Sequence, residues 1–387
     1  MNLLIFTWKH EFMLRDIVEV FKEWNYSLSF FEFDIYKKDK SNNPDLLKAA
    51  IEYLDQKSYD AVFSINYFPD IARACHEKNI TYISWTYDCP LDLENIEETL
   101  IYPTNRAFFF DKKQCDDFVK EGITTAFHMP LGINSKRLSQ FCSSSKYECD
   151  ISFVGNIYHS SYPTLCKYMS DYYQGYTKGM ISAQKNTYGA YLVKEAISDS
   201  FLEQINEDLQ KHQCPYAIDG KHVSKNQLAY SLATEATFEN RLLYLGLLSN
   251  NHKLNWYTSK DSSVLSNINK CDPVDYYTEM PVVFKSSKIN LHIGLHAIPS
   301  GISLRQLDIL GCKGFLLSSF QPELFDYFVP GEDFDYYTCP EEAYEKADFY
   351  LNNENIRAKV AQNGFEKASQ LFDYHIVLKS LIKDALG

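Results

Sequence analysis

Residues 288–337 read KINLHIGLHAIPSGISLRQLDILGCKGFLLSSFQPELFDYFVPGEDFDYY, and this stretch decides our interpretation of the fold. It opens with a short apolar strand at 289–293, which runs into a polar loop that contains Ser300 and Gly301. Apolar residues then recur at helical spacing, and a buried strand at 314–319 follows. The pattern predicts a strand–loop–helix–strand unit, which is the repeating unit of parallel α/β sheets.

The start of the predicted helix carries a cation and an acid. Backbone N–H groups in a first helical turn lack helical partners, and the positive dipole end attracts anions. Arg305 is expected one turn inside, where a guanidinium can hold a phosphate by two parallel hydrogen bonds. Asp308 follows on the same face, within reach of a ribose or paired with the arginine. Glu323 is expected beyond the next strand, at the edge where α/β sheets bind ligands. An ordinary βαβ unit with a salt-bridged surface helix fits the same residues.

Three segments of the C-terminal part resemble one enzyme family. They are SGISLRQLDILGCKGFLL at 300–317, PELFDYFVPGEDFDYY at 322–337 and YLNNENIRAKVAQNGFEKA at 350–368. Together they are similar to the nucleotide-sugar site of GT-B glycosyltransferases, specifically the spore-maturation-type (CgeB-like) branch with its glycosyl transferases group 1-like C-terminal domain. The similarity covers about the last hundred residues. The sequence departs from the family at Lys313, where a small residue usually follows the cysteine.

The resemblance implies an α/β protein with the GT-B fold, in which two Rossmann-like domains face each other across a cleft. We expect the N-terminal, acceptor-side domain at residues 1–140, joined by a final helix at about 373–387. The nucleotide-sugar domain is expected at 149–372. Strands also alternate with helices through the first 128 residues, which independently favours a doubly wound, mostly parallel sheet.

The link between the domains and an insertion are also visible in the sequence. MPLGIN at 129–134 resembles the segment that closes the first GT-B domain, and the serine-rich residues 141–148 fit a linker. Residues 163–248 show helical periodicity without a chemical motif. We interpret them as a helical insertion that shapes acceptor binding.

The resemblance assigns further residues to the donor. Gly155 and Asn156 follow the first strand of the second domain, and glycine allows a backbone to approach a ligand closely. Trp256 and Tyr257 match the place where related enzymes bind the base, although core packing is the alternative for such aromatic residues. His296 is expected to face the diphosphate, as a histidine near this point does in related sequences.

Loops of the first domain supply candidate catalytic residues. The loops after its first, third and fourth strands share one sheet edge, which would bring His10, Glu11, Asn66 and Asp88 toward one crevice. Asp88 stands directly after a strand in SWTYDCP, and the resemblance places such an aspartate facing the acceptor. Asp88 or His10 could act as the base of an inverting enzyme. A turn aspartate and a surface histidine are the alternatives.

Whole-chain composition narrows the class of protein. The 387 residues suggest two or more domains, and 45% hydrophobic with 23% charged residues is typical of a folded soluble chain. The net charge of −13 argues against a nucleic-acid partner. The first apolar run is too short for a signal peptide, and no stretch reaches the length of a transmembrane helix. The 10 cysteines have no metal or redox spacing and favour reduced thiols in a cytoplasmic protein.

No metal site and no cofactor besides the donor is expected. Asp333 and Asp335 form a DxD pattern, but nothing in the sequence places it beside the phosphate loop. His292 and His296 lie at a strand end and in a loop, not on one helix face, so they do not form a zinc pair.

The expected function is metal-independent hexosyl transfer from an NDP-sugar, with UDP as the favoured nucleotide, to a protein or surface-glycan acceptor. Amides at the helix start and Arg305 would neutralise the departing diphosphate. Two alternatives remain open at this point: a non-catalytic sugar-nucleotide or glycan binding protein, and an NDP-sugar epimerase on the same architecture. Stereochemistry is open as well.

Overall fold

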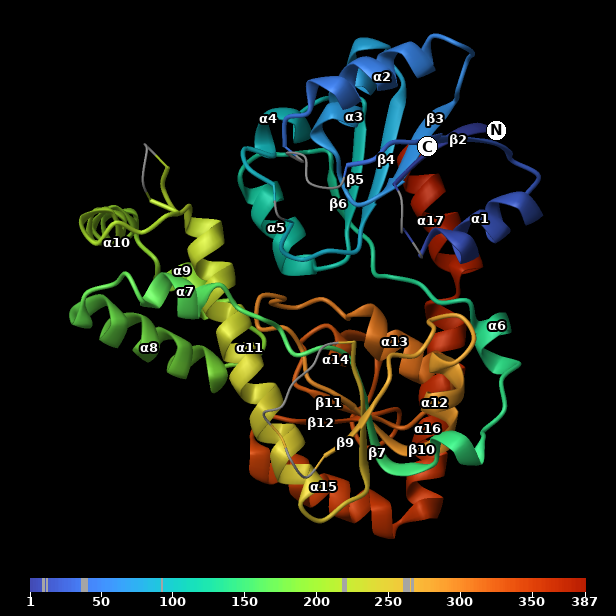
Figure 1. The fold of residues 1–387 in the computed structure, drawn as a ribbon. Coiled ribbons are helices and arrows are strands. Elements are labelled where there is room, and N and C mark those ends of the chain that lie inside the picture. Colours follow the sequence, from blue (N-terminus) through green and yellow to red (C-terminus); the bar gives the residue numbers. More distant parts are fainter. Residues whose placement is uncertain are drawn as a thin grey trace. The chain divides into compact units, whose positions relative to one another are not determined.

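The computed structural model describes residues 1–8, 11, 13–35, 41–91, 93–217, 221–259, 265 and 268–387. The chain divides into two compact units, Met1–Ser135 with Ser369–Gly387 and Lys136–Ala368. Each unit is built on a parallel six-stranded sheet covered by helices (Figure 1). The α/β class predicted from the sequence is therefore confirmed.

The sheet of the first unit has the strand order β2-β1-β3-β4-β5-β6. Its central strands are apolar runs buried on both faces, as parallel sheets require, and every residue of β3 is buried. The strands are β1 (Asn2–Thr7), β2 (Ser27–Glu32), β3 (Ala61–Ile65), β4 (Thr81–Thr86), β5 (Asn105–Phe109) and β6 (Ala126–His128). The helices between them are α1 (Leu14–Glu23), α2 (Pro44–Leu54), α3 (Pro69–Glu77), α4 (Glu97–Leu100) and α5 (Lys112–Lys120).

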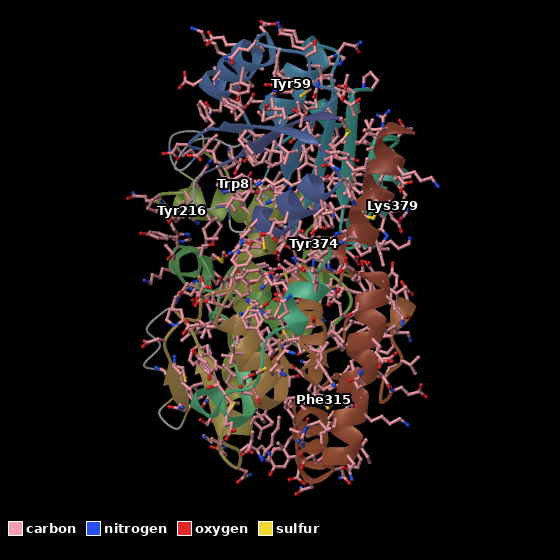
Figure 2. The ribbon with its side chains drawn as sticks, turned by 90° about the vertical axis from the view of Figure 1, so that its right-hand side faces the viewer. Trp8, Tyr59, Tyr216, Phe315, Tyr374 and Lys379 are labelled. Carbon is pink, nitrogen blue, oxygen red and sulfur yellow. The ribbon has the colours of Figure 1, made fainter. Side chains whose placement is uncertain are left out.

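The C-terminal helix α17 (Tyr374–Leu386) belongs to the first unit. The amide of Tyr374 donates to the carbonyl of Ile133 (2.8 Å), and the amide of Ile133 donates to the carbonyl of Phe372 (2.8 Å). Gly132 allows this approach, because a Cβ there would lie 2.7 Å from the Tyr374 ring. Tyr374 and Lys379 mark the helix in Figure 2. The end of the chain is thereby tied to the segment that leaves β6.

The sheet of the second unit has the order β12-β11-β10-β7-β8-β9. Its strands are β7 (Cys149–Val154), β8 (Leu254–Tyr257), β9 (Asn269–Cys271), β10 (Ser287–His292), β11 (Leu316–Ser319) and β12 (Asp335–Tyr337). Short helices α6 (Ser135–Ser139) and η1 (Ser145–Tyr147) precede the sheet. The other helices around it are α12 (Met280–Ser286), α13 (Leu304–Gly311), α14 (Leu324–Tyr327), α15 (Pro340–Asn352) and α16 (Glu354–Leu371).

Between β7 and β8 the chain forms a group of helices with a core of its own. They are α7 (Tyr162–Cys166), α8 (Asp171–Lys185), α9 (Leu192–Ala196), α10 (Asp199–Lys211) and α11 (Lys225–Ser249). The long helix α11 serves both parts: Leu228 and Leu232 pack into the helical core, whereas Tyr244 and Leu248 pack into the core of the sheet (Figure 1). No helix in the described part of the chain is long and apolar enough to cross a membrane.

The segment Y-L…R…G that contributes to the family resemblance has a structural role. The Tyr350 hydroxyl donates to Asp335 (2.7 Å), and the Arg357 guanidinium donates to the Tyr350 carbonyl (2.6 Å). Gly364 on α16 faces the backbone of Asp333 so closely that a Cβ would collide with its carbonyl oxygen and lie 2.8 Å from Leu310. These residues therefore fix α15 and α16 against the end of the sheet.

The departure from the family pattern at Lys313 has a physical explanation. Lys313 adopts a left-handed φ of 59°, the conformation that often ends a helix. The following Gly314 has no left-handed φ, but a Cβ there would lie 2.6 Å from the Asn290 amide nitrogen. The lysine therefore takes the strained backbone position, and the glycine serves the close approach between α13 and β10.

Replacing Gly364 with alanine should destabilise the second unit by about 3 kcal/mol, because backbone atoms cannot move aside for the new methyl group. Gly175 on α8 is a matched control, since a Cβ there meets nothing within 4 Å. Gly175→Ala should stabilise by about 0.5–1 kcal/mol through helix propensity. Urea unfolding of both variants measures the difference. Equal effects would show that the contact between α16 and Asp333 is not tight.

Candidate functional site

The loops after β7 and β8 are fastened to each other at the carboxyl edge of the second sheet. The Asn156 side-chain oxygen accepts from the Thr258 hydroxyl (2.9 Å) and from the Ser259 amide (2.9 Å). The Gly155 carbonyl accepts from the Trp256 indole N–H (2.8 Å). Gly155 and Asn156 thus lie at the sheet edge where α/β proteins bind ligands, with the Asn156 carboxamide oxygen already used to hold the two loops together.

The expected base-stacking role of Trp256 and Tyr257 is not supported. Both residues lie within β8, and Trp256 is 0% and Tyr257 4% exposed. Burial raises the pKa of the Tyr257 hydroxyl, which contacts Asn255 (3.4 Å). Neither ring presents a face to a ligand in this structure. Trp256 belongs to the hydrophobic core of the second sheet, and Tyr257 is the buried last residue of β8.

Arg241 on α11 is a buried cation at the same edge, and the sequence analysis did not identify it. Its guanidinium donates to the Ile293 carbonyl at the end of β10 (2.7 Å) and to the Asn156 carbonyl in the loop after β7. The rings of Phe153 and Tyr158 lie 5.2 Å and 4.6 Å from its Cζ atom. The side chain therefore bridges the two central loops of the sheet edge.

The charge of Arg241 has no counter-charge among the residues that the structure describes. Only 8% of the residue is exposed, and its Nε atom is buried without an acceptor. Burial lowers the pKa of the guanidinium, which means that the site destabilises the cation. A buried charge without a partner is expensive, and an anion placed beside it relieves the penalty. The arrangement is that of an anion site.

Arg305 and Asp308 lie together, as their spacing predicted, but they face α12. The helix α13 begins at Leu304, so Arg305 is in the first turn and not one turn inside. Its guanidinium lies 3.8 Å from the Asp308 carboxylate, contacts the sulfur of Met280 and lies 5.7 Å from the Phe284 ring. Asp308 is buried and also accepts from the Tyr276 hydroxyl. The structure thus shows the pairing alternative, and a role toward phosphate or ribose stays a prediction.

The loops after β10 and β11 are joined by the predicted residues Ser300, Gly301 and Glu323. The Ser300 hydroxyl donates to the Glu323 carboxylate (2.7 Å), and the Glu323 amide donates to the Ser300 carbonyl (3.1 Å). The Gln321 side chain donates to the Gly301 carbonyl (2.9 Å). Glu323 is only 2% exposed. The three residues form one hydrogen-bonded corner directly before α13.

His296 is enclosed by the helical insertion. One ring nitrogen lies 2.9 Å from the Asn240 amide nitrogen, the other lies 3.5 Å from that of Gln184, and the ring stacks on Tyr188. Burial lowers the pKa of His296 to about 4, so the ring is neutral near pH 7. Its surroundings come from α8, α11 and the loop after α8. The expected role toward a diphosphate stays a prediction, and the structure adds a role in docking the insertion.

A buried histidine also fixes the start of α13. His292 lies between the Ser318 hydroxyl (3.0 Å) and the Ser303 hydroxyl (3.0 Å), and Ser303 precedes the first residue of the helix. Burial lowers the pKa of His292 to about 3, so it acts as a neutral hydrogen-bonding link. The amides of Leu304 and Arg305 have no protein acceptor within the described residues. The first turn therefore keeps two N–H donors for an anion.

The two aspartates of the DxD pattern form ion pairs with lysine side chains. The Asp333 carboxylate pairs with Lys367 (2.7 Å), and the Asp335 carboxylate pairs with Lys346 (2.7 Å). Among the described residues, no group of three or more histidine, cysteine or acidic side chains could hold a metal ion. The lysine pairs explain both aspartates without a ligand.

In the first unit, Asp88 and Asn66 meet at the carboxyl edge of the sheet. The Asn66 side chain donates to the Asp88 carboxylate (2.8 Å), and its oxygen accepts from the amides of Tyr87 (2.7 Å) and Asp88 (3.1 Å). Asn66 has a φ of 62°, which directs its side chain along the edge. The carboxylate of Asp88 is exposed and positioned. His10, the other predicted catalytic residue, lies outside the described residues.

Glu11, in the loop after β1, has an altered acidity. Burial raises its pKa from 4.5 to about 7, against the opposing effect of a hydrogen bond from the Thr7 hydroxyl (2.7 Å). Its second carboxylate oxygen is buried without a partner. A carboxyl group whose pKa lies near the working pH can exchange protons with a substrate. Glu11 therefore joins Asp88 and His10 as a candidate base.

Glu11→Gln should change stability in a pH-dependent way. The folded-state pKa lies above the unfolded one, so the folded chain binds the proton more tightly and wild-type stability falls as pH rises from about 4.5 through 7. The variant should match the wild type at pH 4 and exceed it by about 3 kcal/mol at pH 8. Urea unfolding at both pH values measures this, with Glu98→Gln on exposed α4 as the control. A pH-independent difference would refute the burial of the Glu11 charge.

Comparisons with known proteins agree with this geometry. Residues 232–383 match the family model described as glycosyl transferase-like. Among solved structures, the chain is similar to a glycosyltransferase from Rickettsia africae, with a TM-score of 0.56, 9% identity, and 99% of this chain and 97% of that chain covered. It is similar to sucrose-phosphate synthase from Thermosynechococcus elongatus, with a TM-score of 0.55, 9% identity and coverage of 99% and 98%.

A third similar structure is Anabaena HepE in complex with UDP-glucose, with a TM-score of 0.54, 8% identity and coverage of 99% of both chains. No curated protein matches the chain. The low identities establish a shared fold. The chain thus has the GT-B glycosyltransferase fold, and its residues 232–383 form a glycosyl transferase-like region.

Proposed function

We propose that this chain is a metal-independent glycosyltransferase that moves a hexosyl group from a UDP-sugar to a protein or surface-glycan acceptor. The observation that carries the proposal is the buried Arg241 guanidinium, which has no counter-charge among the described residues and lies at the sheet edge of the second unit. Arg241 belongs to the glycosyl transferase-like region. A nucleoside diphosphate would supply the anion that this cation lacks.

The choice of UDP rests on similar structures. HepE was solved with UDP-glucose, and a similar α-glucosyltransferase, with a TM-score of 0.54, was solved with UDP-glucose and DNA. Both share only the fold with this chain. The net charge of −13 disfavours a nucleic-acid acceptor here, which leaves a protein or a glycan.

Charge neutralisation explains how such an enzyme would work without a metal. Negative charge develops on the diphosphate as the bond to the sugar breaks. Arg241 is already desolvated between the loops after β7 and β10, and the amides of Leu304 and Arg305 add the positive end of α13. Fixed donors of this kind need no reorganisation during the reaction. In this proposal, Arg305 is the second cation at the site.

The acceptor side of the proposal rests on the first unit. Asp88, held by Asn66, and His10 remain our candidate bases for an inverting reaction, and Glu11 is added because its pKa lies near neutrality. We also propose that the chain belongs to the CgeB-like branch and acts in the cytoplasm. All ten cysteines are free thiols, which suits a reducing compartment.

Arg241→Lys should weaken UDP binding by about 30-fold, roughly 2 kcal/mol, because lysine keeps the charge but loses the planar fork that bridges two loops. Arg305→Lys should weaken it by less than about threefold, since Asp308 already offsets that charge. Calorimetric titration with UDP measures both, and circular dichroism verifies folding. A larger loss at Arg305 would identify the start of α13 as the main phosphate site. Unchanged affinity in both variants would refute the proposed donor site.

Metal independence has its own test. Release of UDP from a UDP-sugar should proceed at the same rate, within about a factor of two, after exhaustive treatment with EDTA, because protein donors neutralise the leaving group. Added Mg²⁺ or Mn²⁺ should leave the rate unchanged. A loss of activity that is restored by either ion would contradict this part of the proposal. Product formed from the donor without acceptor would favour an epimerase.

A further inference from the structure

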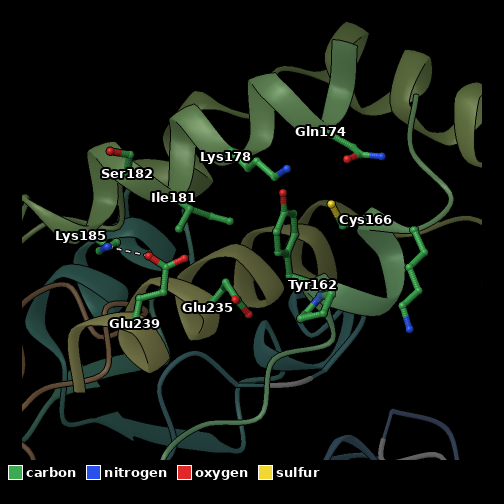
Figure 3. A pocket seen from close by; sticks show the side chains of 11 residues that line it. Tyr162, Cys166, Gln174, Lys178, Ile181, Ser182, Lys185, Glu235 and Glu239 are labelled. Atoms are coloured by element: carbon green, nitrogen blue, oxygen red, sulfur yellow. Dashed lines mark hydrogen bonds and ion pairs between the residues drawn. The ribbon is translucent and has the colours of Figure 1, made fainter. Parts of the chain in front are cut away.

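The helical insertion contains a trough whose lining includes none of the candidate site residues discussed above. It lies between α8 and α11, is closed by α7, and has a volume of about 670 Å³ (Figure 3). We call it the α8–α11 trough. It is lined by Tyr162, Pro163, Cys166, Lys167, Gln174, Lys178, Ile181, Ser182, Lys185, Glu235 and Glu239.

Opposite charges face each other across this trough. Lys185 on α8 pairs with Glu239 on α11 (2.6 Å) and joins the two walls. Lys178 and Glu235 stand on opposite walls, and neither forms an ion pair within the described residues. Burial raises the pKa of Glu235, to which the neighbouring Glu239 contributes. A hydrogen bond from Ser160 opposes this rise in pKa, and the half-buried carboxylate can accept further donors.

The trough also offers a fixed apolar surface. Tyr162 is only 5% exposed, and its hydroxyl is hydrogen-bonded to Thr177 (2.9 Å), so it forms the buried base of the trough. Ile181 on α8 is buried as well, whereas Pro163, which also lines the trough, is exposed. The exposed ring of Pro163 between polar walls can receive the C–H face of a ring-shaped polar ligand.

These features select a class of ligand by exclusion. A simple anion near Lys178 would face Glu235, and a simple cation near Glu235 would face Lys178, so neither ion is favoured. The walls are helices, whose backbone groups are already paired, so an extended peptide finds no strand edge. An amphipathic helix needs an apolar groove, whereas most lining residues here are polar. An uncharged ligand with many groups that both donate and accept can use both walls.

We propose that the α8–α11 trough binds a sugar unit of a glycan, whose hydroxyl groups donate to Glu235 and accept from Lys178 while its ring lies against Pro163. This inference rests on the proposed function insofar as it assigns the glycan as acceptor. Of the two acceptor classes in the proposed function, this inference names the glycan and not the protein.

The trough can be tested separately from the donor site. Glu235 and Arg241 both lie on α11, but their separation of six residues, at about 100° each, puts them roughly 120° apart around the helix axis. Arg241 faces the loops after β7 and β10, whereas Glu235 faces α8. Substitutions in the trough should therefore leave UDP affinity unchanged.

Cys166 provides a built-in reporter for occupancy, because it lines the trough and is a partly exposed free thiol. We would treat the full chain with N-ethylmaleimide in the presence of cellotriose, maltotriose, chitotriose or mannotriose, and follow Cys166 by peptide mass spectrometry. At least one trisaccharide should slow its alkylation severalfold. The exposed Cys142, which lies outside the insertion, should react at an unchanged rate.

Variants of the lining residues then show whether the trisaccharide protects Cys166 from alkylation by binding in the trough. Glu235→Gln and Lys178→Ala should each weaken binding of the protecting trisaccharide by at least about tenfold, whereas Glu203→Gln at an exposed position of α10 should not. Protection that survives both trough variants would overturn the proposal. So would protection by a short mixed-charge peptide but by no trisaccharide, or no protection at all. Failure to bind UDP alongside normal trisaccharide protection would refute the proposed donor instead, and would leave the sugar site standing.

Discussion

A guanidinium without a counter-ion among the described residues is the constraint on which the second unit depends. Arg241 is almost wholly buried, and its contacts are the carbonyls of Asn156 and Ile293 and two aromatic rings. Neutral partners of this kind orient a cation but do not neutralise it. A folded chain that keeps such a charge gives up stability, and the usual compensation is a ligand that supplies the missing anion. The two unpaired amides at the start of α13 point to the same type of ligand.

The same helix that places Arg241 also explains why the insertion is part of the site. The C-terminal half of α11 packs on the sheet, and its N-terminal half organises the helices of the insertion. Asn240 and Gln184 hold His296, so the loop after β10 is positioned partly by residues that the chain inserts before β8. A movement of the insertion would therefore also displace His296. The insertion is thus mechanically coupled to the edge of the sheet.

The sequence was informative where one pattern had one physical meaning. Apolar runs bounded by turn residues located most strands, because a strand buried on both faces has no polar positions. The strands β9 and β12 were missed, since three residues at the margin of a sheet carry no periodicity. The stacking role of Trp256 and Tyr257 stays a prediction that their burial does not favour, because the sequence pattern of an aromatic residue at a strand end is the same whether it packs inward or faces a ligand.

Arg241 was missed because it sits on a long helix far in sequence from the loops that it joins. A signal was present: it falls on the buried stripe with Thr237, Tyr244 and Leu248, where helical periodicity demands an apolar residue. A charge in such a position is either paired or functional.

The residues of the family resemblance were easier to recognise, yet several of them support the fold. Gly364 allows the backbone of Asp333 to approach α16, the Arg357 guanidinium donates to a carbonyl at the end of α15, and the Arg305 guanidinium lies beside the Asp308 carboxylate. Motif residues can thus mark a site because they hold its loops and helices in place. Arg241, whose buried charge most clearly calls for an anionic ligand, lies outside the motif.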